Sequence, residues 1–210
     1  MIWLLLLLAW LALGYAPAAA VFLPFHMLAS SLVALLSAPG TILRLASNAL
    51  LRKNHGLEHA TINILEQELG DIRSAGMATE EGFFIKAQGV SAQDVAHAAS
   101  LGRARLLEGN SRLAIHPRCG TSRAAANVIM SALFVVLLIL GHLLSPAGIL
   151  AALLLGHLTG PVFGTFLQKH FTTSARVERV FIVGVEALRS RGFLGLVFRP
   201  NTFFVRTVWH

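Results

Sequence analysis

The residues from 124 to 144 read AAANVIMSALFVVLLILGHLL and carry no charged side chain. Because a helix rises about 1.5 Å per residue, this run is long enough to cross the roughly 30 Å hydrocarbon core of a bilayer. A second uncharged run covers residues 146 to 168. The connection between the two runs is very short, so we expect an antiparallel transmembrane hairpin over residues 124–168.

The composition of the chain favours the same class of protein. Of its 210 residues, 55% are hydrophobic and only 13% are charged, and the mean hydropathy is +0.69. In soluble domains about a quarter of all residues are charged. The net charge of +7 arises from basic residues that flank the apolar runs. That distribution is typical of anchoring at a membrane surface, so we expect a lipid bilayer as the partner and no nucleic acid.

Residues 1–38 form another apolar region, which Pro17 and Pro24 interrupt. A broken helix and a helical hairpin both fit this segment, so the number of crossings stays open. The basic residues lie in residues 38–123 and from Lys169 onward. The positive-inside rule then places both segments in the cytoplasm. The sequence predicts a mostly α-helical, multi-pass protein of the bacterial inner membrane with three or four transmembrane or re-entrant helices. Residues 53–123 and the C-terminus would be cytoplasmic.

Residues 53–112 hold eight of the ten acidic residues and are expected to form a small α-β-β-α domain. Asn54 is the predicted N-cap of a first helix that ends at Gly70. Alternating side chains then predict a β-hairpin with strands at residues 72–77 and 83–88.

A second helix of this domain is predicted to start at Ser91-Ala-Gln-Asp94, which resembles a capping box. A unit of this size buries little apolar surface by itself. We therefore expect it to pack on the membrane helices or on a partner, either another membrane protein or a second copy of the chain.

The tail over residues 174–210 mixes basic residues with bulky apolar ones. Five apolar side chains occur at helical spacing: Val177, Val180, Phe181, Val185 and Leu188. This spacing predicts an amphipathic helix that lies in the membrane interface. Packing of the tail against the cytoplasmic domain is the alternative.

Two short polar motifs carry the candidate chemistry. The first is His55-Gly-Leu-Glu58-His59. Residues four apart share one face of a helix, so both imidazoles can bind one metal ion with Glu58 beside them. An exposed pair of histidines at this spacing, without any function, is the alternative.

The second motif is His116-Pro-Arg-Cys119-Gly-Thr121, within a loop over residues 113–123 that leads into the apolar run. His116 is a candidate third metal ligand, and the only cysteine of the chain is a candidate fourth. Alternatively, Arg118 anchors phospholipid, and Cys119 is a small buried apolar residue.

The two motifs, in this order, resemble the YqhQ-like family of bacterial membrane proteins, which are regarded as metal-dependent and functionally uncharacterised. The likeness lies in the eight residues from His55 to Ile62 and in the residues from Ser111 to Ser122. It covers about a third of the chain, and here a longer connection separates the motifs. The resemblance implies a metal site more firmly than it implies a reaction.

These observations predict a metal-dependent hydrolase that acts on amide or ester bonds at the cytoplasmic membrane face. Zinc, or another divalent transition metal, would be held by His55, His59 and His116, with Glu58 as general base. Arg118 could stabilise a developing oxyanion. If Cys119 were a fourth ligand, the site would be structural instead.

An accessory subunit of a larger membrane complex is a further alternative. His142 and His157 lie in the two apolar runs, where they could ligate haem or a pigment. A hydrogen bond to the facing helix is the commoner role for such a residue, and His26 is treated in the same way.

Overall fold

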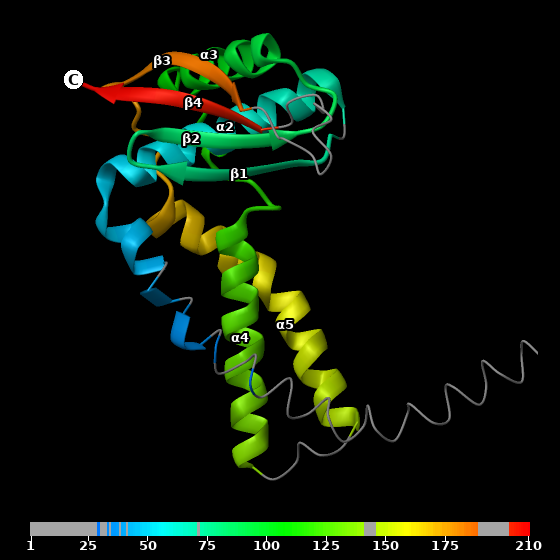
Figure 1. Ribbon diagram of the computed structural model, residues 1–210. Coiled ribbons are helices and arrows are strands. Elements are labelled where there is room, and N and C mark those ends of the chain that lie inside the picture. Colours follow the sequence, from blue (N-terminus) through cyan, green and yellow to red (C-terminus); the bar gives the residue numbers. More distant parts are fainter. Residues whose placement is uncertain are drawn as a thin grey trace, which may run out of the picture.

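The computed structural model consists of a four-stranded sheet backed by helices, from which a helical hairpin projects (Figure 1). The described part of the chain starts with helical residues between 29 and 47 and continues into helix α2 (Ala49–Leu69). The structure describes residues 29, 33, 35–37, 39–40, 42–70, 72–140, 146–188 and 202–210.

The sheet has the strand order β1-β2-β4-β3, and all its neighbours are antiparallel. Strands β1 (Ser74–Thr79) and β2 (Gly82–Ala87) form a hairpin with a two-residue turn. Strands β3 (Val180–Leu188) and β4 (Thr202–Trp209) come from the far end of the chain, and β4 pairs with β2 in the middle of the sheet. The sheet therefore joins segments that are more than 100 residues apart.

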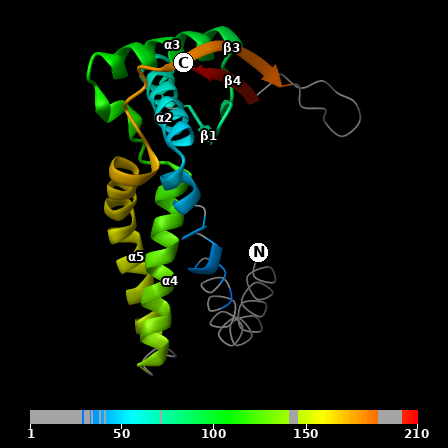
Figure 2. The same cartoon turned by 90° about the vertical axis from the view of Figure 1, so that its left-hand side faces the viewer.

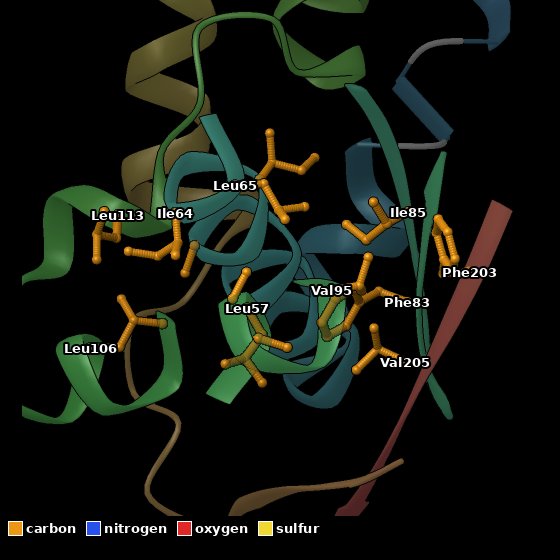
Figure 3. Packing of buried hydrophobic residues seen from close by; sticks show 14 of the residues in the cluster. Leu57, Ile64, Leu65, Phe83, Ile85, Val95, Leu106, Leu113, Phe203 and Val205 are labelled. Atoms are coloured by element: carbon orange, nitrogen blue, oxygen red, sulfur yellow. The ribbon is translucent and has the colours of Figure 1, made fainter. Parts of the chain in front are cut away.

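Helices α2 and α3 (Ala92–Leu107) cover one face of the sheet and enclose the core (Figure 3). Alternate side chains of the two central strands point into this core, namely Phe83 and Ile85 of β2 and Phe203 and Val205 of β4. Lys86, between the buried residues Ile85 and Ala87, is exposed, as the two-residue period of a half-buried strand requires.

The projecting hairpin consists of α4 (Gly120–Ile139) and α5 (Pro146–Leu167), which pack along each other (Figure 2). A Cβ atom at Gly164 would lie 2.6 Å from the Cα of Ser122, so glycine permits the close approach of the two helices. The hairpin connects to the sheet through η1 (Ser111–Ala114) at one end and through a π-helical turn, η2 (Gln168–Thr172), at the other.

The expectation of a multi-pass membrane protein is contradicted. Within the described residues, no helix combines the length and apolar character needed to cross a bilayer. Helix α4 includes Arg123 and Asn127 and ends at Ile139, so its wholly uncharged, mainly apolar part is shorter than the run over residues 124–144. The predicted transmembrane hairpin and inner-membrane location are corrected accordingly. Most of the N-terminal segment over residues 1–38 lies outside the described residues.

The amphipathic helix expected over residues 174–210 is also wrong, because this tail contributes β3 and β4. Its apolar residues are mainly β-branched or aromatic, which suits a pleated and partly buried strand. A short apolar run fits the period of a helix or of a strand, so the spacing alone could not decide.

Two predictions that depend only on neighbouring residues are confirmed, and one is wrong. The capping box at Ser91 and Asp94 is confirmed, with both reciprocal hydrogen bonds present. The hairpin of β1 and β2 is confirmed with slightly shifted bounds. The predicted cap of the first helix is wrong: the N-cap is Asn48, whose side chain accepts a hydrogen bond from the Leu51 amide. Asn54 is buried inside α2, where it bonds the β1–β2 turn and Thr207 of β4.

Replacement of Phe83 by alanine tests the position of the core. The Phe83 ring is fully buried between the sheet and the helices, so Phe83→Ala should lower the free energy of unfolding by about 3–5 kcal/mol. Urea denaturation measures this change. Val183→Ala is the control, because Val183 is 59% exposed on β3. Its replacement should lower the free energy of unfolding by less than about 1 kcal/mol. Equal effects of the two variants would contradict the described core.

Candidate metal centre

The first motif lies in the second and third turns of α2, and the structure buries it. His55, Glu58 and His59 are each no more than 5% exposed. The imidazole rings of His55 and His59 lie on one face of the helix with centroids 4.4 Å apart. A helix therefore places two imidazoles and a carboxylate together in an interior site.

Each histidine of this pair is oriented by a backbone carbonyl from another segment. Nδ1 of His55 donates to the carbonyl of Thr172 at 2.8 Å, and Nδ1 of His59 donates to the carbonyl of Ala114 at 2.9 Å. Because a carbonyl oxygen only accepts, the proton of each neutral ring sits on Nδ1. Nε2 of each ring then presents a lone pair, the arrangement found in metal-ligating histidines.

Cys119 meets these lone pairs from the second motif. Pro117 occupies the second position of a tight turn that the Cys119 amide closes by donating to the His116 carbonyl. The turn places Cys119 just before α4, with its Sγ 3.3 Å from Nε2 of His55. One ligand atom from each of His55, His59 and Cys119 lies within 4.8 Å of the others.

These three residues could bind a metal ion. Ligand atoms in tetrahedral zinc sites are about 3.3–3.8 Å apart, since zinc–nitrogen and zinc–sulfur bonds are about 2.0 and 2.3 Å long. Nε2 of His59 is buried and has no hydrogen-bond partner in the described part of the chain, which a metal ion would supply. Burial lowers the pKa of both imidazoles and so favours the neutral form that binds metal.

His116 has a different place from the one that the sequence predicts. Its Nε2 lies 3.3 Å from Glu66, and its ring centroid is 6.0 Å from that of His59. The group of possible metal ligands consists of His55, His59 and Cys119 and does not contain His116. Gln168 clamps the His116 backbone: its Oε1 accepts from the His116 amide at 2.9 Å, and its Nε2 donates to the His116 carbonyl at 3.1 Å.

Arg118 lies beside His116 and binds the same carboxylate. Its Nη2 is 2.9 Å from Oε1 of Glu66, and its side chain is 51% exposed. The same oxygen accepts from Ser74, so Glu66 joins α2, the second motif and the start of β1. The structure thus places Arg118 in an ion pair on the outer side of the motif.

Glu58 is the functional side chain with the most unusual environment. Burial raises its pKa well above the ordinary value, and the neighbouring Cys119 raises it further. Its Oε2 has no hydrogen-bond partner within the described residues. The carboxyl group occupies the space that a side chain at position 76 would need, because a Cβ on Gly76 would lie 2.1 Å from Oε1. Gly76 therefore permits the carboxylate to lie against β1.

A cavity of about 910 Å³ opens beside the centre. Its walls include His55, Glu58 and Cys119, together with the residues of β1 and its turn from Gly76 to Glu81. Glu186 of β3 also lines it, and its carboxylate pairs with Arg206. A small molecule or an extended chain can therefore approach the thiol, imidazole and carboxylate groups from solvent.

Some site residues were not predictable from sequence. No recognisable motif includes Gln168 or Gly76. The carbonyls of Ala114 and Thr172 were not predictable either, because a carbonyl can come from any residue type. The glycine within His55-Gly-Leu-Glu58-His59 was a usable signal. A Cβ at Gly56 would lie 2.2 Å from the Ser174 carbonyl, so glycine lets the segment with Thr172 lie against α2. His26, His142 and the side chain of His157 lie outside what the structure describes.

The fold and the site define a small α+β protein with a buried His-His-Cys group that could hold a metal ion. The chain belongs to the family described as Domain of unknown function (DUF6391), whose model matches residues 50–185. It is 31% identical over 136 residues to an uncharacterised protein of Picosynechococcus sp. (strain ATCC 27264 / PCC 7002 / PR-6). The match covers 59% of this chain and 66% of that protein, just under two thirds. No solved structure matches the chain.

The matched family residues include both motifs, from His55 to Thr121. These comparisons lend no support to membership of the YqhQ-like family, so that likeness remains one of motifs.

Replacement of Gly56 by alanine tests how the centre is positioned. The added methyl group would collide with the Ser174 carbonyl and displace the Thr172 carbonyl that orients His55. We expect Gly56→Ala to weaken metal binding by about 10- to 100-fold, the usual effect of losing an orienting partner. Competition with a chelating dye measures the affinity for zinc.

Gly184→Ala is the matched control, because a Cβ at this position meets no atom within 4 Å. An unchanged zinc affinity of folded Gly56→Ala protein would contradict the positioning role of this contact.

Proposed function

We propose that this chain is a zinc-dependent hydrolase of amide or ester bonds. The observation that carries the proposal is the convergence of two imidazole lone pairs and a thiol beside a buried carboxylate at the wall of a cavity.

His55, His59 and Cys119 would hold the ion. Two nitrogen donors and one sulfur donor form a ligand set that suits zinc, and three protein ligands leave a fourth position open. When bound, zinc lowers the pKa of a water molecule toward neutrality and polarises a substrate carbonyl.

Glu58 would act as the general base. It is adjacent in sequence to His59 but is not a member of the group of possible ligands. Its buried carboxyl has a raised pKa, which makes it a stronger base than an exposed glutamate. It can take a proton from the attacking water and then deliver that proton to the leaving group.

Arg118 has a supporting part in this scheme. Its ion pair with Glu66 steadies the turn that carries Cys119, and the Gln168 clamp holds the same turn from η2. Both contacts therefore position a ligand and do not touch the reacting atoms.

Replacement of Glu58 separates a catalytic centre from a structural one. Glu58→Gln preserves the shape of the side chain but cannot accept a proton, so turnover should fall by about 10²- to 10⁴-fold while one zinc per chain is retained. Elemental analysis measures the metal, and hydrolysis of p-nitrophenyl acetate and of fluorescein-labelled casein measures turnover.

Two variants complete this experiment. His59→Ala and Cys119→Ala each remove a ligand and should lose both the metal and the activity. Absence of stoichiometric zinc from the wild-type protein would overturn the proposal. Retention of zinc without hydrolysis of either substrate would favour a structural metal site.

A further inference from the structure

Strand β1 forms one edge of the sheet (Figure 1). It pairs with β2 along its whole length, and within the described residues it has no strand partner on its other side. Three of its six residues, Ala75, Gly76 and Met77, are exposed. An edge of this kind presents backbone groups that can pair with another strand.

The register identifies which backbone groups point outward. The amide of Thr207 donates to the carbonyl of Glu81 at 2.9 Å, so Glu81 faces β4. Successive residues of a strand face opposite neighbours, and therefore Phe84 and Lys86 face β1. Their partners on β1 are Met77 and Ala75. The alternate residues of β1 therefore direct their N–H and C=O groups to the free edge. These residues are Ser74, Gly76 and Ala78.

This free edge runs past the metal centre. Gly76 is the residue whose Cα lies against the Glu58 carboxyl, and residues 76 to 81 line the same cavity as His55 and Cys119. A chain paired with Gly76 and Ala78 would therefore pass beside the general base and the metal ligands.

The other cavity walls suit an uncharged or basic chain. Apolar surface is supplied by Met77, Phe84, Leu188 and Phe204. The ring centroids of Phe84 and Phe204 are 4.7 Å apart. Among the described residues that line the cavity, Glu58, Glu80 and Glu81 carry carboxyl groups and Arg44 carries a guanidinium, while the carboxylate of Glu186 is paired with Arg206. This excess of negative charge disfavours anionic substrates such as phosphate esters.

We propose that the edge of β1 binds a peptide in extended conformation and presents one of its amide bonds to the His55-His59-Cys119 centre. Backbone pairing with Ser74, Gly76 and Ala78 would hold the peptide, as in other cases of strand addition to an exposed sheet edge. This inference rests on the proposed function and narrows its substrate class to peptides.

The reaction is then hydrolysis of a peptide bond. The oxygen of one water molecule adds to the amide carbon, and the carbon–nitrogen bond breaks. Glu58 accepts one proton of the water and passes it to the departing nitrogen, which leaves as an amine. The second proton of the water also passes from the new carboxylic acid to the amine, so the products are a carboxylate and an ammonium group, and no oxidant or further reactant is consumed.

The experiment uses a peptide tethered to the metal by a hydroxamate group. The probe is acetyl-Ala-Leu-Ala-Phe-Ala with a C-terminal hydroxamate, titrated into the zinc-loaded full-length Glu58→Gln protein, in which turnover is expected to be strongly reduced. Acetohydroxamate alone is the reference for binding to the metal. We expect the peptide to bind at least about tenfold more tightly than acetohydroxamate.

Alternate N-methylation then tests the pairing with the sheet edge. One version of the probe is methylated at the amides of residues 2 and 4, and a matched version at residues 3 and 5. Strand pairing uses every second amide, so one version should lose affinity by about three- to tenfold per hydrogen bond and the other should be nearly unaffected.

The outcomes separate the two proposals. If acetohydroxamate does not bind to the zinc-loaded protein, the proposed function fails. If acetohydroxamate binds, but the peptide adds no affinity or both methylated versions weaken equally, the edge-strand inference fails while the metal centre stands.

Discussion

Two hydrogen bonds from histidine rings to backbone carbonyls determine how this structure is assembled around its centre. The carbonyls of Ala114 and Thr172 come from the two segments that flank the α4–α5 hairpin, and both meet the same face of α2. Each bond fixes a ring orientation and a tautomer at once, so Nε2 of both rings is directed into the interior. The positions of the hairpin and of the sheet are thereby coupled to the geometry of a possible ligand set.

The chemistry of the site was partly readable in the sequence. Helical spacing predicted that His55 and His59 act together with Glu58 beside them, and the second motif offered His116 and Cys119 as candidates to join them. The sequence favoured His116 as the third ligand and left Cys119 as a possible fourth, because neither the turn at Pro117 nor the clamp from Gln168, 52 residues from His116, can be read from it. The structure turns the His116 ring toward Glu66 and brings the Cys119 thiol to His55.

In the fold too, features that depend on neighbouring residues were predicted, and features that depend on distant residues were not. The capping box at Ser91 and the hairpin of β1 and β2 depend on neighbouring residues, and both were predicted. The pairing of β2 with β4 depends on contacts across more than 100 residues, which no local period encodes. The apolar runs suggested membrane spans because composition reports only apolar character, whereas no helix in the described part of the chain is both long and apolar enough to cross a bilayer.

The separation of the ligand residues along the chain has a further consequence. An ion bound by His55 and Cys119 would act as a cross-link that closes a loop across 64 sequence positions, as a disulfide does. Loops of this length restrict the unfolded chain enough to contribute about 4 kcal/mol in the chain-entropy description. Metal supply would then govern not only the chemistry of the centre but also the fraction of chains that are folded, and a chelator would act on this protein as a denaturant.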